Sequence, residues 1–187
     1  TLFQPTLKSD GMLPLAGEQP VAAVFVIDTS PSMGYVAGEK SRLEEARGRA
    51  FTLLDDLPPN SRVAVLDPVD PVPAWEQSIA DARKKIEGLK EPHGGGPPIT
   101  TALATAYRLL QTANADADGS AILPGLVVAF SDRTVACWDP SRAEDLVKLR
   151  DAVPRPPGAD AARPAVAGLF VDVGVDQPVD VAVLSAT

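Results

Sequence analysis

The sequence predicts an α/β fold: a three-layer sandwich with a doubly wound, mostly parallel sheet and helices on both faces. Two observations carry this prediction. Apolar runs alternate along the chain with segments of helical periodicity. The apolar runs also lack the polar alternation of a half-exposed strand, which is typical of parallel strands that are buried on both faces.

Apolar runs mark the strands of this sheet. The first, 21–27, is continuous and β-branched and ends at Asp28. Further strands are expected at 62–66, 126–130, 166–173 and 179–184. Residues 67–73 contain three prolines and predict a loop or an edge segment.

Helical segments are predicted between the strands. Ser41 and Glu44 form a capping box that begins the first helix, which the prolines at 58–59 end. Apolar residues at helical spacing predict further helices at 79–89, 99–110 and 141–153. A second capping box, Ser141 with Glu144, is expected to begin the last of these helices.

Length, composition and charge are those of one globular domain. The chain has 187 residues, of which 45% are hydrophobic and 22% charged, and this balance suits a single core. A net charge of −8 without a basic block argues against nucleic acid as a partner. No apolar run approaches the ~20 residues that span a bilayer, so we expect a soluble chain.

The single cysteine, Cys137, and the single histidine, His93, limit the metal chemistry. They exclude an internal disulfide, a cysteine zinc cluster and a multi-histidine site. A thiol nucleophile needs a positioned base, and the only histidine is distant in sequence. We therefore expect Cys137 to be a packing residue and His93 to be solvated in its loop.

An Asp-x-Ser-x-Ser pattern leaves the first predicted strand. Asp28, Ser30 and Ser32 offer one carboxylate and two hydroxyls on alternate residues of a tight turn. These hard oxygens suit Mg²⁺ or Mn²⁺, with waters in the remaining positions. Asp132 follows the run 126–130 in the same way, and such sheets bind ligands at the carboxyl ends of their strands.

A purely structural role is the alternative for these residues. Asp28, Ser30 and Ser32 could cap the turn through hydrogen bonds to the backbone. Asp132 could act only as a partner of Arg133 or Ser32 in a degenerate site.

Other conspicuous residues have simpler explanations. Gly94 to Gly96 lack the pattern of a phosphate cradle and are expected to form a turn. Asp172, at a predicted strand end, is expected to satisfy loop backbone. Trp75 and Trp138 could be exposed anchors for a partner or could be buried at the margins of the sheet.

The segment 28–34 resembles the opening of the metal-ion-dependent adhesion site (MIDAS) in von Willebrand factor type A (VWA) domains. The resemblance extends to residues 57–65, 94–103 and 131–132 and covers about residues 20–184. It implies a VWA or Rossmann-like domain at 20–187 after an N-terminal extension at 1–19, with a proline-rich loop at 154–164.

Residues 2–7 are similar to a stretch that follows a membrane helix in bacterial membrane-anchored relatives, the aerotolerance-operon Bat-type proteins. This resemblance implies a longer bacterial parent protein. The membrane tether would then lie outside this segment.

The resemblance further implies a non-enzymatic module that binds a protein partner. In that scheme the metal is held by Asp28, Ser30, Ser32 and, through water, Asp132. An acidic residue of the partner completes its coordination.

Two positions depart from the family pattern. The threonine ligand of the family matches Pro97, which has no hydroxyl, and Thr100 and Thr101 fall one helical turn later. Arg133 stands where a glycine is common and could place a guanidinium beside Asp28 or Asp132. We therefore expect Mg²⁺ or Mn²⁺ to bind weakly or not at all, and a change of Pro97 to threonine to strengthen binding.

Two other functions remain as alternatives. One is a structural VWA domain whose site has decayed and binds no metal. The other is a phosphohydrolase with Asp28 as nucleophile, although Ser30 stands where such enzymes need a second aspartate.

Overall fold

The computed structural model describes residues 19–69, 73–115, 122–158 and 164–175. The strand expected at 179–184 lies outside these ranges, as do residues 1–18 of the predicted extension. Among the described helices, none has the length and apolar character needed to cross a membrane.

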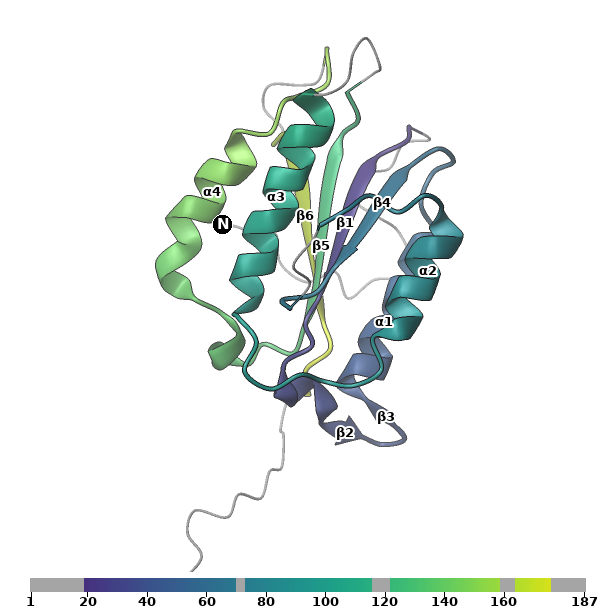
Figure 1. Ribbon diagram of the computed structural model, residues 1–187, viewed down its shortest axis with the longest axis vertical. Coiled ribbons are helices and arrows are strands. Elements are labelled where there is room, and N and C mark those ends of the chain that lie inside the picture. The colour runs from purple at the N-terminus through teal and green to yellow at the C-terminus, as the bar shows by residue number, and fades with distance from the viewer. Residues whose placement is uncertain (1–18, 70–72, 116–121, 159–163, 176–187) are drawn as a thin grey trace, which may run out of the picture.

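Four of the described strands form one parallel sheet, in the order β4-β1-β5-β6 (Figure 1). Their bounds are β1 Ala22–Ile27, β4 Arg62–Leu66, β5 Gly125–Ser131 and β6 Val166–Asp172. Every pair in this sheet is parallel, with Val24 opposite Ala64 on one side and Val127 on the other. The predicted parallel sheet is therefore confirmed.

Helices cover both faces of the sheet (Figure 1). Their bounds are α1 Arg42–Asp55, α2 Ile79–Gly88, α3 Ile99–Ala115 and α4 Ala143–Asp151. Helices α1 and α2 pack on one face, and α3 and α4 pack on the other. The predicted three-layer sandwich is confirmed.

Strand β1 is buried on both faces because its alternate side chains enter two separate clusters. Phe25 and Ile27 pack with α1 and α2, whereas Val24 and Val26 pack with α3 and α4. Full burial of one such side chain stabilises the fold by about 1.5–3 kcal/mol. This two-sided burial is why the run 21–27 shows no polar alternation.

The two predicted capping boxes have different outcomes. The Ser41 hydroxyl accepts from the Glu44 amide, and the Glu44 carboxylate accepts from the Ser41 amide, so the box that begins α1 is confirmed. The box at Ser141 is wrong. Asp139 instead caps a short 3₁₀ turn, η3 Pro140–Arg142. Its carboxylate accepts hydrogen bonds from both the amide and the hydroxyl of Ser141.

Short elements surround the carboxyl ends of the strands. They are η1 Pro31–Gly34, the antiparallel pair β2 Val36–Ala37 and β3 Lys40–Ser41, and η2 Val135–Cys137. In Figure 1 the β2-β3 hairpin lies at the end of the sheet where β1 finishes.

The sheet has a topological switch point between β1 and β5. From β1 the chain passes through α1 to β4, whereas from β5 it passes through α4, on the other face, to β6. The two connections diverge and leave a crevice beyond these strand ends. Asp28 and Asp132 are the residues that directly follow β1 and β5.

Candidate functional site

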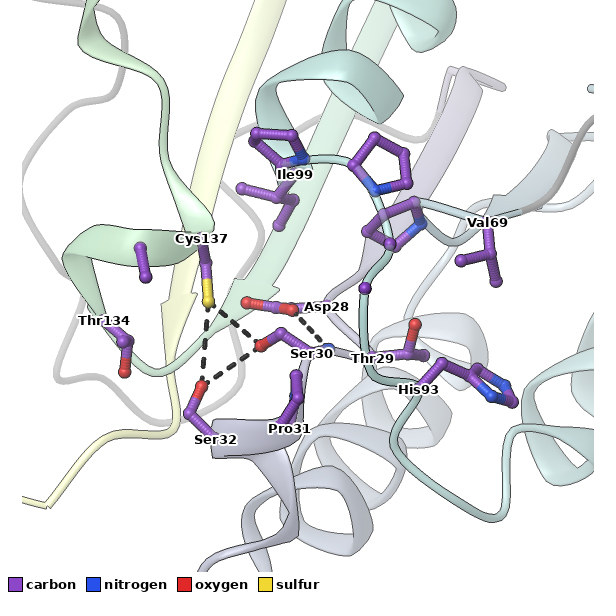
Figure 2. Close-up of a pocket in the computed structure, with 16 residues that line it drawn as sticks. Asp28, Thr29, Ser30, Pro31, Ser32, Val69, His93, Ile99, Thr134 and Cys137 are labelled. Carbon is purple, nitrogen blue, oxygen red and sulfur yellow. Dashed lines mark hydrogen bonds between the residues drawn. The ribbon is translucent and has the colours of Figure 1, made fainter. Parts of the chain in front are cut away.

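A pocket of about 290 Å³ lies at the switch point (Figure 2). Three parts of the chain form most of its wall: the turn after β1, the loop before α3 and the loop after β5. Its lining includes Asp28, Ser30, Ser32, Val69, His93, Pro97, Thr134 and Cys137. Ligand sites in open α/β sheets are expected at such a place.

Asp28 is almost completely buried, with 1% of its surface exposed. One carboxylate oxygen accepts a hydrogen bond of 2.9 Å from the Ser30 amide, and the other accepts one of 2.7 Å from the Ser131 hydroxyl. The carboxylate therefore caps its own turn, as the structural alternative proposed. Each carboxylate oxygen has a further lone pair, so this role leaves the oxygens able to bind a ligand.

Ser30, Ser32 and Cys137 form a triangle of polar atoms beside Asp28 (Figure 2). The Ser30 and Ser32 hydroxyl oxygens lie 3.1 Å apart. The Cys137 thiol donates to the Ser30 hydroxyl at 3.0 Å, and its sulfur lies 3.7 Å from the Ser32 oxygen. The Asp-x-Ser-x-Ser turn thus points its hydroxyls at a cysteine from the loop after β5.

Cys137 was expected to be a packing residue, but it lines the pocket. Its sequence position, five residues beyond Asp132, gave no sign that η2 turns back toward the β1 end. Burial raises the pKa of the Cys137 thiol, and the negative charges of Asp28 and Asp132 act in the same direction. Both effects favour the neutral thiol, so the group is no activated nucleophile in this state.

Asp132 forms a buried ion pair with Arg42, the first residue of α1. The second Asp132 oxygen accepts a hydrogen bond of 3.1 Å from the Thr134 amide. The Arg42 guanidinium also donates to the Ser32 carbonyl and lies 4.5 Å from the centre of the Tyr35 ring. Burial alone would raise the pKa of Asp132, but its hydrogen bonds outweigh this effect and lower the pKa.

Arg133 was considered as a partner of Asp132, but the cation beside Asp132 is Arg42. Arg133 pairs with Asp172, with 2.8 Å between its Nε and the carboxylate oxygen. The backbone explains the difference: Arg133 has a φ of 65°, the left-handed conformation that favours glycine, and its side chain is directed to the end of β6. Asp172 also accepts from the Gly174 amide at 2.8 Å, which confirms its expected role in a loop.

The loop before α3 brings Pro97 to the pocket but neither threonine that follows it. Thr100 is 3% exposed, and its hydroxyl has no hydrogen-bond partner among the described residues. Gly95 has a φ of 76°, so the glycine run serves the expected turn. His93 is exposed at the pocket rim, and its backbone amide donates to the Thr29 carbonyl at 2.6 Å.

The two tryptophans are half-buried against the core, which supports the second of the two explanations given for them. Arg62 lies 4.8 Å above the Trp75 ring. Trp138 meets Phe170 edge to face with 5.7 Å between the ring centres.

Exposed apolar side chains occur beside the pocket. Among the described residues, three large hydrophobic side chains are exposed: Val36 at 59%, Val69 at 41% and Val135 at 79%. Val69 lines the pocket, Val135 belongs to η2, and Val36 follows η1. This end of the sheet therefore has exposed apolar side chains close to a pocket that contains the Asp28 carboxylate and the hydroxyls of Ser30 and Ser32.

Side chains in the pocket wall, together with the neighbouring Asp132, could hold a cation. One ligand atom each from Asp28, Asp132 and Cys137 lies within 4.8 Å of the other two. The hydroxyls of Ser30 and Ser32 lie next to the thiol. The donor set thus includes carboxylates, hydroxyls and one sulfur.

Comparison with known proteins gives a family match and matches to solved structures. A family described as "von Willebrand factor type A domain" matches residues 23–134, more than half of the chain. A solved structure titled "von Willebrand factor type A from Catenulispora acidiphila" matches with a TM-score of 0.54 and 20% identity. The match covers 72% of this chain but only 32% of that one, so this chain spans about a third of its length.

Proposed function

Because the chain belongs to the von Willebrand factor type A domain family, we propose that it is a non-enzymatic module that binds a protein partner at the Asp28 pocket. The observation that carries this proposal is the position of the pocket, which contains Asp28, at the switch point of the sheet. Exposed Val69 lines the pocket, and exposed Val135 lies between two lining residues in sequence, Thr134 and Ala136. Apolar side chains around a buried polar group are what a docking partner can cover.

The charges of the pocket suggest how a partner is recognised. Asp28 and Asp132 would repel an acidic side chain of the partner. A divalent cation held by Asp28, Ser30 and Ser32, with Asp132 acting through water, would remove that repulsion. When bound, the cation supplies an open coordination position that a partner carboxylate can fill.

The site has enough donor atoms for a divalent cation, but it offers too few free oxygen ligands to bind Mg²⁺ well. Pro97 contributes no hydroxyl to the pocket that it lines, and Asp132 already has a cationic partner in Arg42. Mg²⁺ demands near-octahedral oxygen coordination and gives up its waters reluctantly. We propose that Mg²⁺ or Mn²⁺ binds weakly here.

The Arg42–Asp132 ion pair favours a second candidate function, which is docking without a metal. Arg42 supplies a positive charge that neutralises one of the two carboxylates. In this form the domain would bind its partner through shape and apolar contact alone. Neither candidate function includes catalysis, since Ser30 stands where a phosphohydrolase would need a second carboxylate.

The similarity of residues 2–7 to Bat-type proteins supports a further proposal, that the parent protein carries a membrane tether outside this segment. Separation of native cells into membrane and soluble fractions, followed by detection of this domain, tests it. Recovery of the domain only in the soluble fraction would contradict the tether.

Site-directed photocrosslinking in native cells tests the docking face. Val135, on the rim, and Asp56, an exposed residue at the far end of α1, are each replaced by benzoylphenylalanine. We expect a crosslinked protein from position 135 and none from position 56. Equal crosslinking from both positions would contradict the proposal.

The same assay separates the two candidate functions. Loss of the Val135 crosslink with a chelator, and with Asp28→Asn, supports docking through a metal. A crosslink that survives both changes supports docking without one.

A further inference from the structure

Cys137 supplies a sulfur atom to a site that the Asp-x-Ser-x-Ser pattern describes only in terms of oxygen. The cysteine is 6% exposed and belongs to η2, after β5. Its sulfur lies 3.0 Å from the Ser30 oxygen and 3.7 Å from the Ser32 oxygen. In Figure 2 the thiol points to the two hydroxyls, on the same side as the Asp28 carboxylate.

We infer that Cys137 is a metal ligand of this site, together with Asp28, and that the site selects a thiophilic divalent cation such as Zn²⁺ over Mg²⁺ or Mn²⁺. This inference rests on the proposed metal-dependent function and gives it a cation preference. The side chain that carries the inference, Cys137, lines the pocket.

The distances fit one ion. Ligand atoms of Asp28, Asp132 and Cys137 lie within 4.8 Å of one another. Zinc bonds to carboxylate oxygen and thiolate sulfur are about 2.0–2.3 Å long. The separation of the Asp28 and Cys137 ligand atoms is therefore close to that of two ligands of one ion.

The charges also fit a zinc ion. Arg42 neutralises Asp132, whereas the Asp28 carboxylate accepts hydrogen bonds from two neutral groups, the Ser30 amide and the Ser131 hydroxyl. When a cation binds, the thiol releases its proton to solvent and becomes a thiolate. Thiolate and Asp28 carboxylate together then balance the two positive charges of the ion.

The ligand chemistry separates zinc from magnesium. Thiolates are soft ligands that select zinc and its neighbours, whereas Mg²⁺ and Mn²⁺ prefer oxygen. Pro97 offers no side-chain oxygen, which a hard cation would need as a ligand. Cys137 offers a sulfur atom, which a hard cation binds poorly. A Zn²⁺ ion with few protein ligands keeps a position for water or for the carboxylate of a partner.

Cobalt absorption spectroscopy tests the assignment, with Co²⁺ as the probe for Zn²⁺. The full chain is titrated with Co²⁺ under reducing, chelator-free conditions, as wild type, Cys137→Ser and Asp28→Asn. We expect a sulfur-to-cobalt charge-transfer band in the near ultraviolet from the wild type, saturating at one ion per chain and abolished by added Zn²⁺. Cys137→Ser is expected to lose the band.

Affinities measured by competition give a second readout. Loss of an outer partner of a metal ligand costs 10- to 100-fold in affinity, so loss of the ligand itself should weaken Zn²⁺ binding by at least about tenfold in Cys137→Ser. Mn²⁺ binding should change by less than about twofold, because Mn²⁺ does not depend on the sulfur. Asp28→Asn should weaken the binding of both ions.

Different results overturn different statements. Co²⁺ binding without the band, or unchanged Zn²⁺ affinity in Cys137→Ser, overturns the cysteine assignment and leaves the oxygen site of the proposed function in place. A band that persists at full strength in Asp28→Asn means that the thiol binds the ion elsewhere, which also overturns it. Failure of the wild type to bind any of these cations overturns both the inference and the metal-dependent form of the function.

A measurement on the wild type alone covers the case in which Cys137→Ser does not fold. Zn²⁺ is expected to slow alkylation of Cys137 by iodoacetamide, and Mg²⁺ at the same concentration is not. Equal alkylation rates with and without Zn²⁺ would overturn the assignment.

Discussion

Arg42 and Asp132 lie 90 residues apart in the sequence and form an ion pair inside the site. Their side chains are 8% and 0% exposed. Arg42 begins α1, and Asp132 follows β5, so the pair fixes the start of a helix to the carboxyl edge of the sheet. The contact determines both the stability of this region and the charge that a ligand meets there.

Replacement of Arg42 by methionine should destabilise the protein strongly. The variant leaves the Asp132 carboxylate buried without its cation, which typically costs about 3–5 kcal/mol. Urea unfolding measures the loss, with Lys84→Met as control. Lys84 is 75% exposed and lies 3.5 Å from Asp81 in a surface pair, which should contribute about 0–1 kcal/mol. Adding Asp132→Asn to Arg42→Met should restore part of the stability, and equal small losses from Arg42→Met and Lys84→Met would contradict this prediction.

Asp132 should also make stability depend on acid pH. Folding lowers its pKa, so the carboxylate stabilises the folded state above the pKa of an unfolded aspartate, about 3.9. This contribution is lost as the pH falls through the lower pKa of the folded state. The difference in unfolding free energy between wild type and Asp132→Asn should therefore narrow from about pH 6 to about pH 3. A difference that stays constant over this interval would show that Asp132 does not contribute through its charge.

Tyr107 carries a buried hydroxyl in α3 that has no hydrogen-bond partner among the described residues. Since burial of an unpaired hydroxyl is unfavourable, Tyr107→Phe should stabilise the protein by up to about 1 kcal/mol. Burial raises the pKa of Tyr107 to about 12. An unfolded tyrosine has a pKa of about 10. As the pH rises from about 10 through about 12, the wild type should therefore lose more stability than Tyr107→Phe does.

Thermal unfolding of the wild type and Tyr107→Phe, at neutral and at alkaline pH, measures both the effect of the hydroxyl and its dependence on pH. Leu110→Ala, which also removes buried surface from α3, serves as a control for packing and should destabilise at every pH. A Tyr107→Phe variant that is clearly less stable than the wild type would mean that the hydroxyl has a partner after all.

Pro97→Thr should raise the affinity for Mg²⁺ and Mn²⁺. The new hydroxyl enters the wall of the pocket next to the Asp-x-Ser-x-Ser turn, and one more oxygen ligand should contribute at least about a tenfold gain. Calorimetric titration measures it, and Pro97→Ala separates the gain of a hydroxyl from the loss of proline. Micromolar Mg²⁺ binding by the unchanged protein would contradict the account of Pro97.

Much of the fold was predictable because its signals are local. A strand buried on both faces must be apolar throughout, and this is how the run 21–27 marks β1. The helix cap at Ser41 and Glu44 is also local, since both partners lie within one turn. The same pattern failed at Ser141 because the preceding Asp139-Pro140 pair provides a competing cap for a different turn.

The candidate site was predictable only in part. Asp28 and Asp132 could be placed because residues that follow adjacent parallel strands meet at one edge of the sheet. Arg42 and Cys137 could not, because their contacts depend on how η1 and η2 fold back over the strand ends. Arg133 was misplaced because the sequence does not show its left-handed backbone conformation.

Titration of wild type and Asp28→Asn with Mn²⁺, followed by calorimetry, tests most directly the claim that the pocket is a metal-dependent binding site. Asparagine can accept from the Ser30 amide through its oxygen and donate through its NH2 group to the Ser131 hydroxyl oxygen, which reverses the second of the two hydrogen bonds of Asp28. The variant should therefore fold with nearly wild-type stability. We predict that the wild type binds one Mn²⁺ weakly and that Asp28→Asn binds none at the same concentrations. Identical titrations of the two folded proteins would contradict the account.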